Sequence, residues 1–212
     1  MADMNLLKRA MGDLEEDAVL RIVKEVAGSG GGEAGAAMEA CQDGMKMVGD
    51  RFEAGEYFIG DLIFAGEIMI NALEIIKPFL SAGDSGGKGK MILCTVQGDL
   101  HDIGKNIVKS MLEAAGFDVL DLGIDVSPET VLETAKAEGV RIIALSGVLT
   151  LALDAMKDVV DIFKSAGLRD SVKIIIGGNP VTKEACAKLG ADEWAHSPQK
   201  TVNVCSAWAA GA

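Results

Sequence analysis

Apolar residues before residue 81 recur at steps of three and four, which is the spacing of one face of an α-helix. The pattern predicts helices over residues 6–26, 33–51 and 59–80, and it leaves open whether the first of these is one helix or two. Glycines within 28–32 and at Gly55 interrupt the pattern between the helices. This part of the chain is therefore predicted to be an all-α bundle of three or four helices.

Beyond residue 90 the pattern changes to short apolar runs that alternate with helical segments. Such runs are typical of buried parallel strands. The predicted strands are 91–96, 118–122, 141–146, 173–176 and 193–195, and the predicted helices are 104–115, 128–138, 154–165, 182–189 and one that starts near 198. This alternation predicts an α/β fold with a flavodoxin-like (Rossmann-like), doubly wound parallel sheet of five strands in the order 2-1-3-4-5.

A glycine-rich stretch without periodicity, 81–90, separates the two patterns. Sequences of this composition form flexible linkers. We therefore expect an all-α helical domain over 1–82, a flexible linker over 83–90 and an α/β domain over 91–212.

The charge balance excludes two classes of partner. Lys and Arg total 20 and Asp and Glu total 32, so the formal net charge is −12. An acidic chain repels both the phosphates of nucleic acids and anionic lipid headgroups. We therefore expect neither nucleic acid nor a membrane as a partner.

The four cysteines lie far apart, at Cys41, Cys94, Cys186 and Cys205, and form no Cys-x-x-Cys pair. We expect reduced core residues rather than a zinc site or a disulfide framework. The N-terminus lacks a basic segment followed by an apolar one, and no apolar run is long enough to span a bilayer. A cytoplasmic protein without a signal peptide is therefore expected.

In an open α/β sheet, ligands bind outside the carboxyl ends of the strands, where the strand order reverses. In this chain that place is formed by the loops after strands 1 and 3, assisted by those after strands 4 and 5. The chain has only two histidines, His101 and His196, and both fall in these loops. The C-terminal edge of the sheet is therefore the expected ligand site.

Within the first of these loops, Asp99 stands two residues before His101. A metal-ligating imidazole usually donates its second ring N–H to a carboxylate, and imidazole suits first-row metals including cobalt. Gly98 and Gly104 allow tight turns and close approach of a bulky ligand. Other interpretations stay open at this point, because Asp99 could cap the next helix and His101 could simply be solvated. Since few other ligand residues stand nearby, a metal here is expected to arrive within a cofactor.

Three motifs in order resemble those of cobalamin-binding domains. Asp99–Gly104 matches Asp-x-His-x-x-Gly, Ser146–Thr150 resembles Ser-x-Leu with Val148 at the leucine position, and Gly177-Gly178 resembles the Gly-Gly motif. In the helical part, 55–67 is similar to the cap of corrinoid methyl carriers. Nearly the whole chain thus resembles the corrinoid proteins of methanol, methylamine, glycine betaine and methoxy-aromatic methyltransferase systems, and methionine synthase contains a larger relative.

The resemblance implies that cobalamin (methylcobalamin or a related corrinoid) binds base-off/His-on, with His101 as the axial ligand of the cobalt and Asp99 tuning it by holding or releasing a proton. The nucleotide tail would follow a groove lined by small residues, with the helical cap over the upper face. The residues expected to contact the cofactor are Gly98, Asp99, His101, Asp102, Ile103, Gly104, Ser146, Val148, Leu149, Thr150, Gly177, Gly178, Asn179 and Pro180, with Phe58 and Leu62 from the cap.

The implied function is that of a methyl carrier, the corrinoid subunit of a multi-component methyltransferase or O-demethylase in one-carbon metabolism. Its expected partners are a substrate:corrinoid methyltransferase, a corrinoid:acceptor methyltransferase and a reductive activator of the corrinoid. The acceptor would be tetrahydrofolate or a thiol. The residues do not identify the methyl donor among methanol, methylamines, betaines and aryl methyl ethers.

One position departs from the pattern of methionine synthase, whose hydrogen-bond chain continues from the aspartate to a serine. That position is Ala152 here, so the path beyond Asp99 is expected to end on Thr150 or on water.

Three other functions fit these residues less well. The main alternative is a cobalamin-dependent sensor or regulator. Such a protein would carry a DNA-binding domain, and we expect none here because no helix-turn-helix segment is seen and the net charge is −12. A radical mutase domain would lack the helical cap. A phosphate-accepting receiver domain would need an aspartate after strand 3, where 146–150 offers none.

Overall fold

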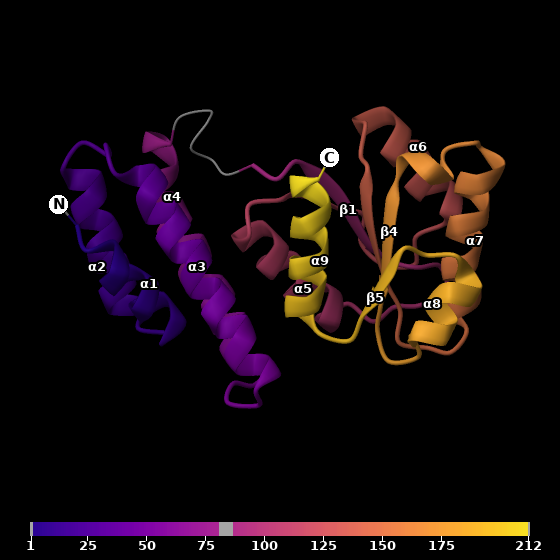
Figure 1. Cartoon of the computed structure of the whole chain (residues 1–212), viewed down its shortest axis with the longest axis horizontal. Helices are drawn as coiled ribbons and strands as arrows, with labels where there is room; N and C mark the ends of the chain where they lie inside the picture. Colours follow the sequence, from indigo (N-terminus) through magenta and orange to yellow (C-terminus); the bar gives the residue numbers. More distant parts are fainter. Residues whose placement is uncertain (1, 81–86, 212) are drawn as a thin grey trace. The chain divides into compact units, whose positions relative to one another are not determined.

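The computed structural model describes residues 2–80 and 87–211, which divide into two compact units (Figure 1). The helical unit comprises 1–88 together with 110–116, and the sheet unit comprises 89–109 together with 117–212. Half of the predicted linker, 83–86, lies outside the described residues, and the first strand already begins at Lys90. The predicted domain boundaries stay predictions.

Four α-helices and one 3-10 turn make up the described part of the helical unit before residue 81. They are α1 (Met4–Gly12), α2 (Glu16–Gly28), α3 (Ala34–Glu53), α4 (Ile59–Ile76) and η1 (Lys77–Phe79). α4 ends before the predicted residue 80 because Pro78 has no N–H to continue the α-helical hydrogen bonds. The bundle predicted from the periodicity is confirmed.

The first predicted helix is two helices. The chain breaks at Leu14, which adopts a left-handed φ of 60°, and α2 restarts two residues later. After the break, Val19, Ile22, Val23 and Val26 form the buried face of α2. Hydrophobic spacing alone could not locate this break, because both helices continue the same apolar periodicity.

The sheet unit contains a five-stranded parallel sheet in the order β2-β1-β3-β4-β5, as predicted. The strands are β1 (Lys90–Thr95), β2 (Asp118–Asp121), β3 (Ile142–Ser146), β4 (Lys173–Gly177) and β5 (Glu193–Ala195). Thr95 is in register with Ser146, and Ser146 with Gly177. The three central strands therefore end in one row across the sheet.

Helices cover both faces of this sheet (Figure 1). They are α5 (Ile103–Ala114), α6 (Pro128–Glu138), α7 (Ala152–Ser165), α8 (Lys183–Leu189) and α9 (Pro198–Ala210), with a 3-10 turn η2 (Arg169–Ser171) before β4. Alternate side chains of β1, β3 and β4 join those of α6, α7 and α8 in one buried cluster. The inner strands are apolar on both faces because both are covered.

All four cysteines are buried and form no disulfide, as predicted. Burial raises the pKa of Cys41, of Cys94 and of Cys205 to about 12, which keeps these thiols protonated at neutral pH. They behave as small core residues and not as ligands.

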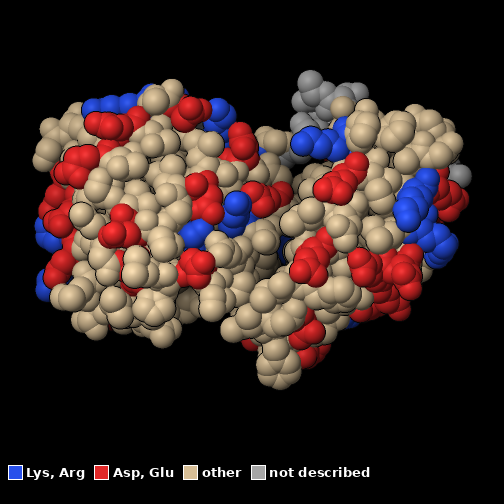
Figure 2. Space-filling model, turned by 180° about the vertical axis from the view of Figure 1, so that it is seen from behind, with Lys and Arg blue, Asp and Glu red and all other residues tan. Residues whose placement is uncertain are grey.

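Acidic and basic side chains are interspersed on the face shown in Figure 2, where the Asp and Glu side chains predominate. Among the described residues, no helix is both long and apolar enough to cross a membrane.

Candidate functional site

The loop that follows β1, residues 96–102, carries the site. Gly98 adopts φ +80°, a conformation that favours glycine, and turns the chain directly after the strand. The hydroxyl of Thr95, a fully buried residue, donates to the carbonyl oxygen of His101 over 2.9 Å. The loop is therefore tied at its far end to the strand from which it leaves.

Asp99 is fully buried, and its carboxylate accepts four hydrogen bonds. Oδ1 accepts from the backbone N–H of His101 at 3.0 Å and lies 2.6 Å from the ring Nδ1 of the same residue. Oδ2 accepts from the backbone N–H groups of Val148 at 2.6 Å and Leu149 at 3.0 Å. Asp99 thereby joins the loop after β1 to the loop after β3, residues 147–151.

These contacts control the charge of Asp99. Burial by itself would raise the pKa of the carboxyl, but hydrogen bonds from Leu149, His101 and Val148 outweigh burial and bring the pKa well below its ordinary range. An ionised carboxylate can only accept hydrogen bonds, so the four donors around Asp99 favour the ionised form. Asp99 is therefore a carboxylate at any physiological pH.

His101 combines a fixed ring with an exposed side chain. Its side chain is 53% exposed, whereas that of Asp99 is 1% exposed. The carboxylate at 2.6 Å favours the tautomer that carries its proton on Nδ1, which leaves the lone pair on Nε2. This is the tautomer and the support that a metal-ligating imidazole requires.

Four large apolar side chains at this edge of the sheet are exposed to solvent. Leu100 and Ile103 lie on either side of His101 in the sequence, and Leu149 and Leu151 lie in the loop after β3. Exposed apolar patches of this kind mark binding surfaces. Among the described residues, no group of three or more His, Cys, Asp or Glu side chains could hold a metal ion. A metal at His101 must therefore arrive within a largely apolar cofactor, and the residues present fit a corrinoid.

The loops after β3 and β4 approach each other at two glycines. The N–H of Gly147 donates to the carbonyl oxygen of Gly177 over 3.0 Å. Gly178 adopts φ +123°, and a Cβ at this position would lie 1.8 Å from the carbonyl oxygen of Gly147. Gly178 is therefore required by this backbone contact, whether or not a ligand also needs the space.

The remaining predicted residues of the sheet unit lie at the same edge of the sheet. Asp102 is exposed and precedes α5, and Gly104 lies in its first turn. Ser146 ends β3, and Thr150 is exposed in the loop after it. Asn179 and Pro180 follow Gly178 in the loop after β4. That these residues contact a cofactor stays a prediction.

Among the described residues, the path beyond Asp99 meets backbone amides and not Thr150, and the alternative of water stays a prediction. The second carboxylate oxygen is already occupied by the two backbone N–H groups of Val148 and Leu149. Ala152 lies at the start of α7 and is buried, and its Cβ occupies the space beside Gly147. Amides rather than a side-chain hydroxyl thus complete the environment of Asp99.

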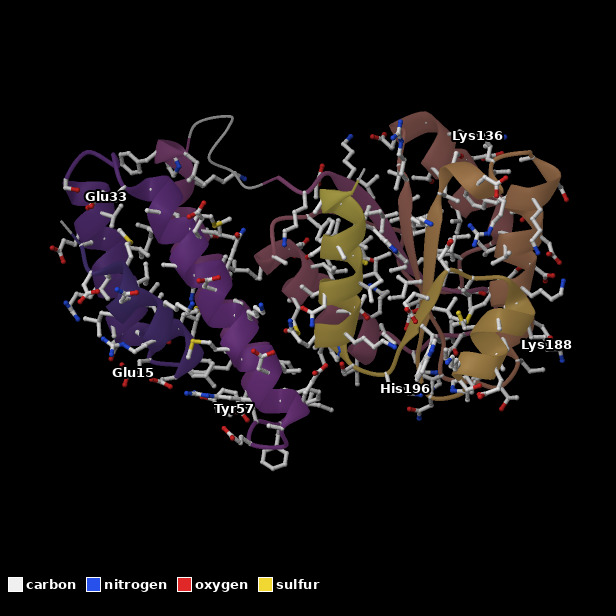
Figure 3. All side chains as sticks on the ribbon, in the orientation of Figure 1. Glu15, Glu33, Tyr57, Lys136, Lys188 and His196 are labelled. Atoms are coloured by element: carbon white, nitrogen blue, oxygen red, sulfur yellow. The ribbon has the colours of Figure 1, made fainter. Side chains whose placement is uncertain are left out.

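The two cap residues differ in exposure. Phe58 precedes α4 and is 72% exposed, and its N–H donates to Asp61 Oδ2 over 2.7 Å. Leu62 is 1% exposed and lies in the core of the helical unit. Tyr57, labelled in Figure 3, donates its hydroxyl to the carbonyl oxygen of Gly12 and so anchors the loop that carries Phe58.

The second histidine has a different environment. His196 lies in the loop after β5 (Figure 3), with its ring 4.8 Å from that of Trp194 in an edge-on arrangement. In the described structure no carboxylate is recorded in contact with this ring. Of the two histidines, His101 alone has the carboxylate support of a metal ligand.

Sequence reasoning missed three residues that hold the His101 loop: Thr95, Lys105 and Asp125. Asp125 accepts from the N–H of Gly98 at 2.7 Å, and Lys105 pairs with Asp121 at 2.7 Å. Asp125 follows β2 and Gly123, so it lies at the same edge of the sheet as His101. Its position after a strand end was the signal by which the sequence could have identified it.

Comparison with known proteins gives two family matches and several similar chains. Residues 89–201 and residues 4–77 each match a family described as B12 binding domain. A corrinoid protein of Desulfitobacterium hafniense is 34% identical over 209 residues, with 96% of each chain covered. Trimethylamine corrinoid protein 1 of Methanosarcina acetivorans is 36% identical over 198 residues, with 92% of each chain covered.

Solved structures agree with these matches. A cobalamin-binding protein from Desulfitobacterium hafniense shares 46% identity with a TM-score of 0.89, and the match covers 98% of this chain and 99% of that one. The methanol:cobalamin methyltransferase complex of Methanosarcina barkeri shares 26% identity with a TM-score of 0.81, covering 99% of this chain and 80% of that one.

Proposed function

This chain belongs to the family of B12-binding corrinoid proteins, and we propose that it carries methyl groups with its cobalt bound base-off/His-on by His101. Family membership gives the corrinoid cofactor and the general role in a methyltransferase system. The mode of ligation, the methyl acceptor and the partners are the parts that we propose.

The observation that supports His-on ligation is the contact of 2.6 Å between Asp99 and the Nδ1 of an exposed imidazole. A buried carboxylate that cannot take up a proton near neutral pH holds the ring proton on Nδ1. It also raises the basicity of Nε2, the atom that would bind the cobalt.

Each residue of the site then has a distinct task. Asp99 orients the ring and keeps its proton in place, and Thr95 fixes the backbone of His101. The exposed apolar side chains of Leu100 and Ile103 would exclude water from around His101 when the cofactor is bound. When bound, the cobalt of the corrinoid supplies the chemistry of accepting a methyl group and passing it on.

This assignment changes the task expected for Asp99. The resemblance implied a carboxyl that holds or releases a proton during methyl transfer. Four donors on one carboxylate stabilise the ionised form throughout, so we propose that Asp99 is a fixed anion. Any proton exchange at His101 would then pass between Nε2 and solvent.

We propose that the partners are a methyltransferase that delivers the methyl group, a second one that passes it to tetrahydrofolate or a thiol, and a reductive activator. The names of similar proteins support the first of these, because they include a trimethylamine corrinoid protein and a methanol:cobalamin methyltransferase complex. The helical unit, with exposed Phe58, is proposed to cap the upper face of the cofactor.

Reconstitution with cobalamin tests this proposal directly. The cobalt(II) form of the wild type should show nitrogen hyperfine splitting in its electron paramagnetic resonance spectrum, which changes from a triplet to a doublet when the histidines carry nitrogen-15. His101→Ala should lose the splitting, whereas the matched control His196→Ala should retain it. A spectrum that is the same in His101→Ala and the wild type would show that ligation by His101 is wrong.

A further inference from the structure

The segment that ends β2 and follows it, residues 121–126, contacts both the His101 loop and the first turn of α5, into which the loop leads. We call it the β2 segment. At the start of the loop, Asp125 Oδ1 accepts from the N–H of Gly98 over 2.7 Å. The N–H of Asp125 in turn donates to the carbonyl oxygen of Asp99 over 3.1 Å. Asp125 thus holds both Gly98 and Asp99, which lie in the loop shortly before His101.

At the far end of the loop, the same segment holds the first turn of α5. Lys105 is 2% exposed, and its Nζ lies 2.7 Å from both carboxylate oxygens of Asp121. The N–H of Gly123 donates to Asp121 Oδ1 over 3.0 Å, which fixes this carboxylate from its own chain. A buried ammonium group is retained only when it is paired and hydrogen-bonded, as Lys105 is.

The β2 segment is itself attached to β1. The N–H of Thr95 donates to the carbonyl oxygen of Gly123 over 2.9 Å, and the N–H of Val126 donates to that of Thr95 over 3.1 Å. Val96 and Val126 form an isolated parallel bridge beyond the strand ends. The segment is therefore a rigid support and not a loose loop.

Asp125 adopts a left-handed φ of 53°. Few residues other than glycine take this conformation readily, and Asp and Asn are the principal exceptions. The position thus demands two properties at once: a left-handed backbone and a side-chain acceptor for Gly98. Asp and Asn supply both, and glycine supplies only the first.

We propose that the β2 segment positions His101 for axial ligation by holding the loop before His101 and the helix turn after it, with Asp125 and the Lys105–Asp121 pair as positioning residues. This inference rests on the proposed function. None of these side chains is expected to touch the cobalt. They set the position of the imidazole ring, as residues that support a metal ligand without touching the metal generally do.

Asp125 offers a matched set of variants. Asp125→Gly keeps the left-handed backbone and removes the acceptor, and Asp125→Asn keeps both. Asp118→Gly is the control, because Asp118 is exposed at the opposite end of β2 and its replacement weakens the strand without touching the loop. In the protein without cofactor, the amide of Gly98 should exchange its hydrogen faster in Asp125→Gly and at the wild-type rate in the other two.

After loading with cobalamin, we expect Asp125→Gly to bind about tenfold more weakly, at the lower end of the effect of removing such supporting contacts. In the electron paramagnetic resonance spectrum of its cobalt(II) form, a smaller fraction of the protein should show nitrogen splitting. Asp125→Asn should show the same fraction as the wild type. Wild-type affinity and splitting in Asp125→Gly would overturn the role of Asp125. A defect in Asp118→Gly as large as in Asp125→Gly would also overturn it.

The Lys105 pair is tested with one single and one double variant. Lys105→Met leaves Asp121 without its buried partner, so this variant loses both stability and ligation. Lys105→Met/Asp121→Asn removes both charges and should recover much of the stability, while the connection between β2 and α5 stays broken. If the Lys105–Asp121 pair positions His101, the double variant should still show reduced nitrogen splitting. Full recovery of the splitting would contradict this role.

The wild type and His101→Ala separate this inference from the function on which it rests. If the wild type shows no histidine nitrogen on cobalt, the proposed mode of binding fails. If the wild type shows that nitrogen and the variants of Asp125 and Lys105 retain it unchanged, only the role of the β2 segment fails.

Discussion

The two units present apolar side chains to solvent in different ways. In the sheet unit, exposed Leu100 and Ile103 flank a histidine whose position is set by a buried carboxylate. In the helical unit, exposed Phe58 and Ile59 begin a helix whose first-turn carboxylate, Asp61, accepts from the backbone N–H of Phe58. An axial ligand needs one defined geometry, whereas a surface that only excludes water needs apolar area. The difference therefore matches the tasks that we propose for the two units.

Replacement of Asp99 is the strongest way to test this comparison. Asp99→Ala leaves the N–H groups of His101, Val148 and Leu149 without their acceptor in a buried place. We expect it to lower the free energy of unfolding of the sheet unit by about 4 kcal/mol, since each buried unsatisfied group costs about 1–3 kcal/mol. Urea unfolding followed by tryptophan fluorescence measures this, because Trp194 and Trp208 both lie in the sheet unit.

His101→Ala is the control for that measurement, because it removes the exposed imidazole and keeps the carboxylate on its backbone donors. A loss of stability as large in His101→Ala as in Asp99→Ala would show that Asp99 serves the histidine alone and does not join the two loops.

The pH dependence of stability should also distinguish Asp99. Burial by itself would raise its pKa, but the hydrogen bonds lower the pKa by more than burial raises it. The pKa of the folded state therefore lies below the unfolded value of about 3.9. A carboxyl with a depressed pKa stabilises the fold above its unfolded pKa, and this contribution is lost as pH falls toward the folded pKa.

We therefore expect the advantage of the wild type over Asp99→Asn to shrink below about pH 4, by up to about 1.4 kcal/mol per pH unit. Urea unfolding at a series of acidic pH values measures this. Asp118→Asn serves as the matched control, because Asp118 is exposed at the start of β2. An advantage that does not change between about pH 4 and pH 2 would contradict the depressed pKa.

The smallest effect on stability is expected in the helical unit. Phe58 is 72% exposed, so Phe58→Ala should change the free energy of unfolding by less than about 0.5 kcal/mol. Leu62→Ala, four positions on and buried, should cost about 3 kcal/mol and is the matched comparison. Circular dichroism during thermal unfolding checks both values.

With cofactor bound, Phe58→Ala should alter the visible spectrum of the corrinoid without loss of fold. A large loss of stability would mean that Phe58 belongs to the core of the bundle and is not a contact surface.

Much of the fold followed from local patterns. The order of the strands and the positions of helices such as α6 agree with prediction, because Ser127 caps α6, Pro128 opens it and Gly139 ends it in a left-handed turn. These signals depend only on neighbours in sequence. The break at Leu14 was left open because its left-handed backbone carries no glycine or proline signal.

The candidate site was predictable only in part. Asp99 and His101 are two residues apart, so their contact is local and a motif reveals it. The other partners of Asp99, at Val148 and Leu149, are backbone groups about 50 residues further along the chain. Every residue except proline carries a backbone N–H, so no motif indicates which amides donate to Asp99. The residue types suggested only the hydroxyl of Thr150 or a water molecule.

The sequence by itself determined the two-part architecture, the parallel sheet and the pairing of a carboxylate with an imidazole at its edge, because each depends on periodicity or on close neighbours. Only the tertiary structure decided that Asp99 is a fully hydrogen-bonded anion and that Gly178 is needed for contact with Gly147. It also revealed that Asp125 holds Gly98 across 27 positions. Such facts arise where parallel strands bring distant loops to one edge, and each contact depends on the register of the whole sheet.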